Sequence, residues 1–337
     1  MPDPRAEGPL DLLPRWPLVV VIALVVLAIT TVSARWYIGK RAGRQLIVPS
    51  TDTTGPGNPG VPYADLVLTS GDHTIRAWWV RAPTLDSAGP AVLLFHPNRS
   101  TLGDQAGIQQ VLYRAGISSL AFDYSGFGKS EGDPTPAALR VDARAAFAVF
   151  TDSARAAGRG VLLGTSLGAA VLLDAIAELQ AGVDGVVLVG AFTSARDLAV
   201  QSGRVPRLAS WPVPNLYDHL TAIRRLSLRG QCLVDRGGLE RVANLIQAVR
   251  FLPWDTAFFK KRIARFYPFR LTRPLLVVHS AQDEVFPIEH AEQLLEAASG
   301  PKRLERLDRG GHATYLSSDA DWLPVIEFIR RGLDVRP

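Results

Sequence analysis

The sequence predicts an α/β fold built on a mostly parallel, doubly wound sheet with helices on both faces. Two patterns predict it. Apolar runs typical of buried strands alternate with segments of helical character, and the runs lie at residues 91–96, 117–123, 160–165, 185–190 and 274–279. Parallel strands need crossover connections, usually helices, so this alternation favours right-handed β-α-β units. Hydrophobic residues make up 47% of the 337 residues, enough to bury such a sheet.

The first element is a long apolar segment near the N-terminus. The 19 residues between Arg15 and Arg35 carry no charge. As a helix they span about 28 Å, against a hydrocarbon core of about 30 Å. Trp16 and the pair Trp36-Tyr37 are placed like the aromatic residues at the two interfaces of a bilayer. We therefore predict a transmembrane helix over residues 16–37.

A cleaved signal peptide is the alternative for this segment, because Val32-Ser33-Ala34 offers small residues at the cleavage positions. The leader is acidic, with Asp3, Glu7 and Asp11, where signal peptides are basic. Two Lys or Arg residues precede the span and four follow it closely. By the positive-inside rule this favours a single-pass cell-membrane protein whose domain after the span lies in the cytoplasm.

We expect residues 38–62 to form a linker, because the chain becomes rich in glycine, proline and threonine there. Such a linker should decouple the anchor from the domain. The sheet then begins with an antiparallel hairpin, whose strands Leu66–Leu68 and Ile75–Val80 are joined around Gly71-Asp72.

The most informative stretch is 160–173, which sets Gly164-Thr165-Ser166-Leu167-Gly168 between an apolar run and a helical run. A strand that ends at Ser166 and a helix that starts at once force the serine into a strained turn. Small residues at Gly164 and Gly168 let neighbouring backbone pass close by. The pattern predicts a nucleophile elbow with Ser166 as the nucleophile.

A serine hydroxyl needs a histidine to take its proton and an acid to orient that histidine. The strand-like run at 274–280 leads into a polar loop that holds Asp283, and we predict Asp283 as the acid. A helix over 289–298 and a short strand over 303–307 precede Gly310-Gly311-His312. We predict His312 as the base. A solvated loop histidine is the alternative.

Further motifs resemble a known family. Residues 122–132 are similar to its D-Y-x-G-[YF]-G-x-S-x-G segment, and 191–194 to its F-T-S segment. From about Leu66 to Phe328 the chain resembles an α/β-hydrolase of the serine aminopeptidase-like group. It is most similar to the membrane-anchored members, which include depalmitoylating thioesterases and bacterial relatives. The resemblance implies the α/β-hydrolase fold with a helical cap insertion.

In that fold the loop after the strand 91–96 supplies one backbone N–H of the oxyanion hole. The family usually has His-Gly where this chain has His96-Pro97. Proline has no N–H, so Asn98 or Arg99 must be the donor, and we choose Asn98. The second donor is the N–H of Leu167. His96 itself is interpreted as a structural hydrogen-bonding residue.

The expected cap carries much of the charge. Residues 203–273 contain 14 Lys and Arg and 4 Asp and Glu, interleaved with large aromatic residues. This composition suits an anionic bilayer surface or an acyl substrate, or else a solvated cationic face. The sequence thus divides into a tail, an anchor, a linker, a two-part core and a cap, at residues 1–15, 16–37, 38–62, 63–202 with 274–335, and 203–273.

Three functions are compatible with these residues. The first is a membrane-anchored serine hydrolase that cleaves an ester or thioester of a small or lipid-like acyl substrate. The second is an aminopeptidase-like amidase, and the third is a catalytically inactive binding module. We expect no cofactor and no metal, because the chain has no phosphate loop and no suitable Cys/His spacing. Nucleic acid is not expected as a partner, since no recognition motif accompanies the net charge of +5.

Overall fold

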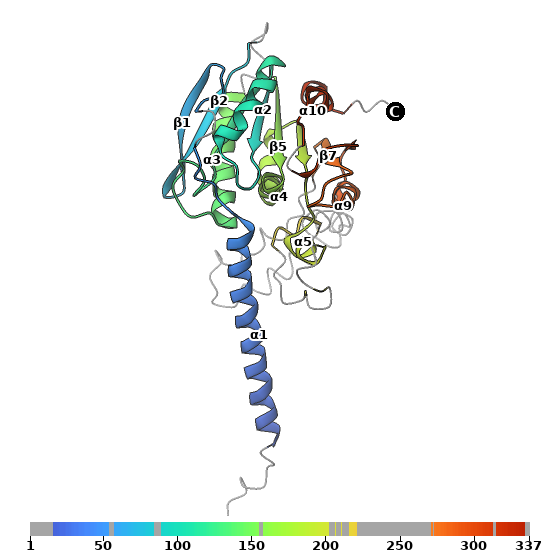
Figure 1. The fold of residues 1–337 in the computed structure, drawn as a ribbon. Coiled ribbons are helices and arrows are strands. Elements are labelled where there is room, and N and C mark those ends of the chain that lie inside the picture. Colours follow the sequence, from blue (N-terminus) through green and yellow to red (C-terminus); the bar gives the residue numbers. More distant parts are fainter. Residues whose placement is uncertain are drawn as a thin grey trace, which may run out of the picture.

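The computed structural model describes residues 16–333, except 54–56, 84–88, 155–157, 202–205, 207–209, 211–215, 221–270, 272 and 313–314. The N-terminal tail and most of the expected cap, with its aromatic and basic residues, lie outside the described residues. Within these ranges the chain forms one sheet flanked by helices and one long N-terminal helix (Figure 1).

The eight strands of the sheet are β1 (Tyr63–Ser70), β2 (His73–Val80), β3 (Pro90–Phe95), β4 (Ser118–Phe122), β5 (Arg159–Thr165), β6 (Gly185–Val189), β7 (Leu275–Ser280) and β8 (Lys302–Leu307). Their order is β1-β2-β4-β3-β5-β6-β7-β8. Strand β2 pairs antiparallel with β1 and with β4, and all later pairs are parallel. The α/β fold with a mostly parallel sheet and an antiparallel start is therefore confirmed.

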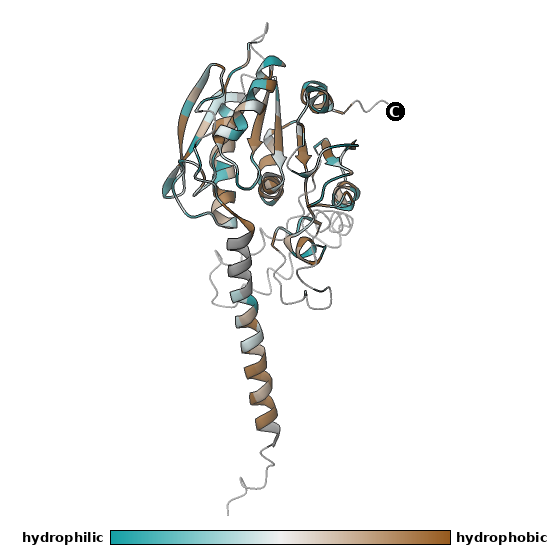
Figure 2. Ribbon diagram, in the orientation of Figure 1, coloured by the Kyte–Doolittle hydropathy of each residue, from teal (hydrophilic) through white to brown (hydrophobic). Residues whose placement is uncertain are grey.

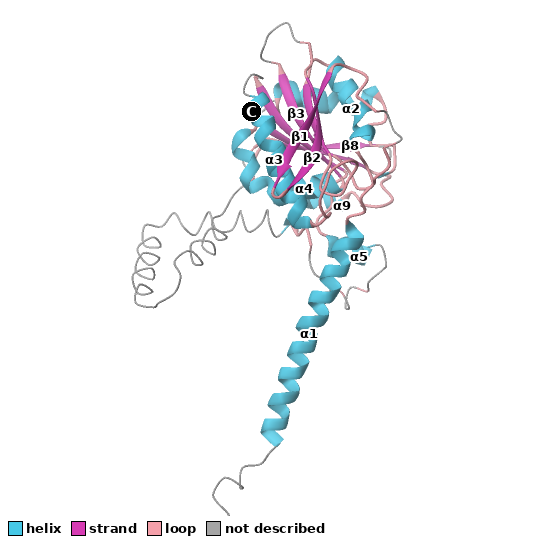
Figure 3. Cartoon of the chain, turned by 90° about the vertical axis from the view of Figure 1, so that its left-hand side faces the viewer, coloured by secondary structure: helices cyan, strands magenta, loops and turns pink. Residues whose placement is uncertain are grey.

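The helices are α1 (Trp16–Leu46), α2 (Leu102–Arg114), α3 (Pro136–Ala154), α4 (Leu167–Leu179), α5 (Ala195–Gln201), α9 (Glu289–Ala297) and α10 (Asp319–Arg331), with a short 3₁₀ turn at Gln180–Gly182. Side chains of α3, α4 and α9 pack on one face of the sheet, and those of α2 and α10 pack on the other. This is the doubly wound arrangement (Figure 3).

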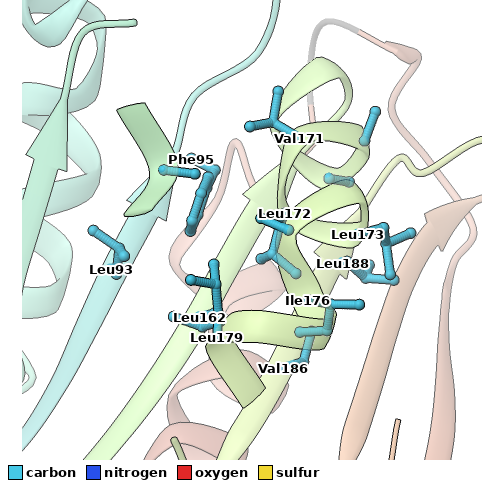
Figure 4. Packing of buried hydrophobic residues seen from close by; sticks show 14 of the residues in the cluster. Leu93, Phe95, Leu162, Val171, Leu172, Leu173, Ile176, Leu179, Val186 and Leu188 are labelled. Carbon is cyan, nitrogen blue, oxygen red and sulfur yellow. The ribbon is translucent and has the colours of Figure 1, made fainter. Parts of the chain in front are cut away.

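Side chains that alternate along the central strands contribute to the hydrophobic cores on both faces of the sheet. In β3, Leu93 and Phe95 join the core beside α4, whereas Val92 and Leu94 join the core beside α2 and α10. Helix α4 presents Val171, Leu172 and Ile176 to the first of these cores (Figure 4). Ten of its residues are buried. Helix α4 is therefore a central helix of the domain, and Ser166 lies at its start.

Helix α1 projects away from the domain in both views (Figures 1 and 3). Its stretch Val19–Tyr37 has a mean hydropathy of 2.2, none of it is buried, and by length and composition it is able to cross a membrane. Figure 2 shows that the hydrophobic part of α1 is the part distant from the domain.

The expected linker differs from the structure in its first half. Helix α1 does not end at residue 37 but continues to Leu46, and the residues after it lie on the domain. Ile47 is only 2% exposed and packs in the core that contains α3 and α4. A glycine- and proline-rich composition begins only at Pro49, so the preceding residues keep helix-forming and apolar character. Helix α1 and the domain are thus not decoupled, contrary to the sequence-based expectation.

Because Ile47 packs in the core, we expect the segment after α1 to stabilise the domain. A chain shortened to begin at Val61 should unfold at a lower temperature than one that begins at Lys40, since burial of an Ile side chain contributes about 1.5–3 kcal/mol. For a chain of this size the expected decrease in Tm is about 2–5 °C. Thermal unfolding of the two chains, with Ile47→Ala in the longer one as a single-residue probe, measures it. Equal Tm values in all three chains would show that the segment contributes no stability.

Candidate active site

Ser166 lies at a sharp turn between β5 and α4. Its φ of 52° and ψ of −114° place it in a region that residues other than glycine rarely adopt. The Ser166 N–H donates to the Val189 carbonyl of β6 at 2.9 Å, which fixes the turn to the sheet. A Cβ on Gly164 would come within 2.8 Å of the backbone of Ala169, and one on Gly168 would overlap the carbonyl of Phe95. The two glycines therefore allow the close approach that the sequence predicts.

The structure brings Ser166, His312 and Asp283 together. The Ser166 Oγ lies 3.0 Å from His312 Nε2, and His312 Nδ1 lies 2.9 Å from Asp283 Oδ2. The three residues follow β5, β8 and β7 respectively, whose carboxyl ends share one edge of the sheet. A hydrogen-bonded chain from hydroxyl to imidazole to carboxylate is the arrangement that can activate a serine.

Asp283 is held by a dense set of donors. Its Oδ1 accepts the N–H groups of Val285 and Phe286 at 2.8 and 2.7 Å, and its Oδ2 accepts the Tyr315 hydroxyl at 2.6 Å. Burial alone raises the pKa of Asp283, but the hydrogen bonds from His312, Phe286 and Tyr315 outweigh burial and lower it to about 2. Asp283 is therefore ionised at neutral pH and able to stabilise a positive imidazole.

Three residues near the imidazole were not predicted as site residues. The Glu284 carboxylate accepts the His312 backbone N–H at 2.9 Å, and the Phe286 ring packs edge-on to the imidazole with centroids 4.4 Å apart. Tyr315, which binds Asp283, also packs edge-on to His312 at 6.0 Å. Glu284 and Phe286 lie in the loop that the sequence marks through Asp283. Tyr315 has no sequence pattern that signals its role.

The two predicted oxyanion donors lie around the same pocket. Leu167 is the first residue of α4, where a backbone N–H has no partner within the helix and the helix dipole favours negative charge. In the other loop, the Arg99 N–H donates to the Val48 carbonyl at 3.1 Å, which commits Arg99 to that bond, and Asn98 remains the predicted donor. The Asn98 side chain bonds to Leu46 and Val48, a task that the sequence does not predict.

A cavity of about 740 Å³ opens onto Ser166 and His312. Its walls come from residues 97–100 of the loop after β3, which we call the oxyanion loop after its predicted role, and from α2, the loop after β7 and the region around Trp322 of α10. Leu46 and Val48 at the end of α1 also line it. Many wall residues are apolar, namely Ile108, Val189, Phe192, Leu198, Val285, Phe286, Leu316 and Trp322. The cavity is large enough for an acyl group of moderate length.

Four of the other histidines, His96, His219, His279 and His290, are buried, whereas His73 is half-buried like His312. His96 is completely buried, its Nδ1 lies 2.8 Å from the Pro97 carbonyl, and it packs against Tyr124 and Phe127. Burial lowers the pKa of His96 to about 4, so it is neutral and fits the structural role predicted for it. In the described part of the chain no three His, Cys, Asp or Glu side chains gather closely enough to hold a metal ion.

Comparison with known proteins places this fold in a class. Residues 92–323 match the alpha/beta hydrolase family. This range exceeds half of the chain, and the chain belongs to that family. The structure is similar to an esterase of Pyrococcus furiosus, with a TM-score of 0.54, 17% identity, and coverage of 85% of this chain and 98% of that one. It is also similar to mouse alpha/beta hydrolase domain-containing protein 10, with a TM-score of 0.51, 19% identity, and coverage of 79% and 96%.

Two relatives in sequence are informative. An uncharacterized membrane protein of Saccharomyces cerevisiae is 33% identical over 144 residues, which are 42% of this chain and half of the yeast protein. An uncharacterized protein of Mycobacterium tuberculosis is 27% identical over 305 residues, which are 88% of this chain and 87% of that protein. The second alignment therefore extends well beyond the region that matches the family.

Tyr315 offers a test of how Asp283 is positioned. In Tyr315→Phe one of the hydrogen bonds to the carboxylate is lost, and such bonds to charged groups contribute about 1.5–3 kcal/mol. We expect kcat for a p-nitrophenyl ester to fall about tenfold with KM nearly unchanged. Tyr63→Phe in the outermost strand β1 is the matched control and should behave as the parent. An unchanged kcat in Tyr315→Phe would contradict the positioning role.

Proposed function

We propose that the protein is a membrane-anchored serine hydrolase that cleaves an ester or thioester through an acyl-enzyme. The observation that carries the proposal is the hydrogen-bonded chain Ser166–His312–Asp283 at a strained turn that faces a cavity of about 740 Å³. The family membership supports hydrolysis in general, and the site geometry supports serine chemistry in particular.

In the proposed mechanism His312 Nε2 takes the proton of Ser166 Oγ as that oxygen attacks the substrate carbonyl carbon. Asp283 stabilises the imidazolium that forms. The N–H groups of Leu167 and Asn98 donate to the oxyanion of the tetrahedral intermediate. His312 then gives its proton to the leaving alcohol or thiol, and the C–O or C–S bond breaks. Water, deprotonated by the same imidazole, hydrolyses the acyl-enzyme and restores Ser166.

A lipid-like acyl substrate is supported by two features. The cavity walls are largely apolar, which suits an acyl chain. The candidate span ends at Tyr37, and α1 then continues for nine residues to Leu46 in the cavity wall. At 1.5 Å per residue this distance is about 14 Å along the helix axis. The cavity thus lies close to the bilayer if α1 spans it, with the domain on the cytoplasmic side that the positive-inside rule favours.

An amidase would use the same groups, and the residues that the structure describes show no feature that favours it. The inactive binding module is disfavoured by the complete chain of hydrogen bonds, because a site without catalysis has no need of an ionised Asp283 behind His312. We therefore retain the ester or thioester hydrolase as the proposed function.

The nucleophile is tested directly by covalent labelling. Ser166→Ala should abolish labelling by a fluorophosphonate, and Asp283→Asn should lower kcat by a factor on the order of 10³–10⁴ through loss of tautomer control. Ser153→Ala at the end of α3 is the control and should be labelled as the parent is. Undiminished labelling of Ser166→Ala would show that another residue is the nucleophile.

The anchor is tested by comparing substrates. The full chain should resist extraction from membranes by carbonate, and a chain that begins at Lys40 should be soluble. On a short water-soluble p-nitrophenyl ester the two chains should agree within about twofold, because both keep Leu46 and Val48, which line the cavity. On a long-chain ester embedded in vesicles the full chain should be at least tenfold faster, through a higher effective concentration. Equal rates on both substrates would argue against a membrane-borne substrate.

A further inference from the structure

The loop that follows β3 is joined to the end of α1 by three hydrogen bonds. Asn98 Nδ2 donates to the Leu46 carbonyl at 2.8 Å, and Asn98 Oδ1 accepts the Val48 N–H at 2.8 Å. The Arg99 N–H donates to the Val48 carbonyl at 3.1 Å. Both ends of the Asn98 amide are thus used on a segment some fifty residues away in sequence. We call residues 46–50 the strap.

The strap is itself held firmly. Ile47 is buried in the core between its two bonded neighbours. The carbonyl of Ser50 accepts the Gly128 N–H at 2.7 Å, which ties the far end of the strap to the loop after β4. The Leu46 carbonyl belongs to the last turn of α1, where carbonyls lack partners within the helix, so the Asn98 amide also caps the helix. The strap is therefore a fixed support for whatever is bonded to it.

The oxyanion loop needs such a support. Pro97 has no N–H with which to bond. Arg99 has a φ of 59°, a left-handed conformation that costs a residue other than glycine about 1 kcal/mol or more. The bond from the Arg99 N–H to Val48 and the two bonds of the Asn98 side chain fix the residues on both sides of the Asn98 peptide. Together they hold Asn98 and the residue after it in place, and Asn98 lines the cavity that contains Ser166.

We propose that the end of the anchor helix is part of the active site, and that Asn98 is a positioning residue. Its side chain grips the strap and thereby holds its own backbone N–H where the oxyanion forms. This inference rests on the proposed hydrolase function. It adds that the strap, through Asn98, sets the rate of the acylation chemistry, while Leu46 and Val48 form part of the wall along the substrate.

The test uses the full chain in detergent micelles, with active sites titrated by a fluorophosphonate so that kcat refers to folded enzyme only. Asn98→Ala keeps the backbone N–H but loses the grip on the strap. We expect kcat for p-nitrophenyl butyrate to fall tenfold to a hundredfold, with KM within about threefold, because a displaced oxyanion donor acts in the transition state. Asn98→Asp keeps the acceptor for Val48 but not the donor to Leu46, and kcat should lie between.

A backbone probe approaches the same contact from the other side. Val48→Pro removes the N–H that Asn98 Oδ1 accepts, and it should lower kcat in the same direction. Asn98→Ala and Val48→Pro break the same hydrogen bond. The decrease in kcat of the double variant should therefore be much smaller than the product of the two single decreases. Thr51→Pro, just beyond the strap, is the matched control and should keep the parent kcat.

The outcomes separate the proposals. An unchanged kcat per titrated site in Asn98→Ala, or losses that multiply in the double variant, would overturn the positioning role. Loss of Tm and of titratable sites, with an unchanged kcat per remaining site, would mean that the contact only stabilises the fold, and would overturn it also. If Asn98→Ala yields no folded enzyme, Val48→Pro alone decides by the same criterion. Hydrolysis that survives in Ser166→Ala would instead refute the proposed function, whatever the Asn98 variants do.

Discussion

The strained turn at Ser166 is the constraint on which the rest of the site depends. Its left-handed backbone costs on the order of 1–3 kcal/mol, and such strain persists only where surrounding structure holds it. Here β6 accepts the Ser166 N–H, and α4 is buried on nearly every side. The absence of a side chain at Gly168 lets the start of α4 approach the end of β3. The same contact therefore brings the loop with Asn98 next to Ser166.

Two buried aspartates, Asp123 and Asp283, have pKa values shifted in opposite directions. Burial raises the pKa of Asp123 to about 7, even though its Oδ1 accepts the Leu102 N–H at the start of α2. Asp283 is buried as well, yet it accepts hydrogen bonds from two backbone N–H groups, a phenol and an imidazole, and its pKa is lowered to about 2. The number and type of donors decide the outcome. Asp123 supports a helix that lines the cavity, whereas Asp283 stays charged behind His312.

The sequence predicts the fold and the relative positions of Ser166, Asp283 and His312 because parallel strands place their carboxyl ends at one edge. Any polar residue directly after such a strand must lie near that edge. Residues that position the site through contacts distant in sequence show no such regular pattern. Tyr315 reaches Asp283 from a turn with no regular pattern, and Asn98 was predicted only for its backbone. Its partner Val48 lies within the segment that the sequence predicts as a linker. The apolar pair Ile47-Val48 does not by its composition reveal that this part of the segment docks on the domain.

The continuous path from α1 into the cavity wall changes what an anchor can do. A flexible linker of 25 residues would let a domain take any orientation toward the bilayer, and its active site would meet lipid only by chance. A helix that ends in hydrogen bonds to the oxyanion loop fixes one orientation instead, about 14 Å beyond the end of the candidate span. The interfacial layer on each side of a bilayer takes up about half of that distance. In the proposed arrangement, with α1 in a bilayer, an amphiphile whose acyl chain stays partly in the bilayer has only a short gap to cross. This short gap is the geometric argument for the proposed membrane-held substrate.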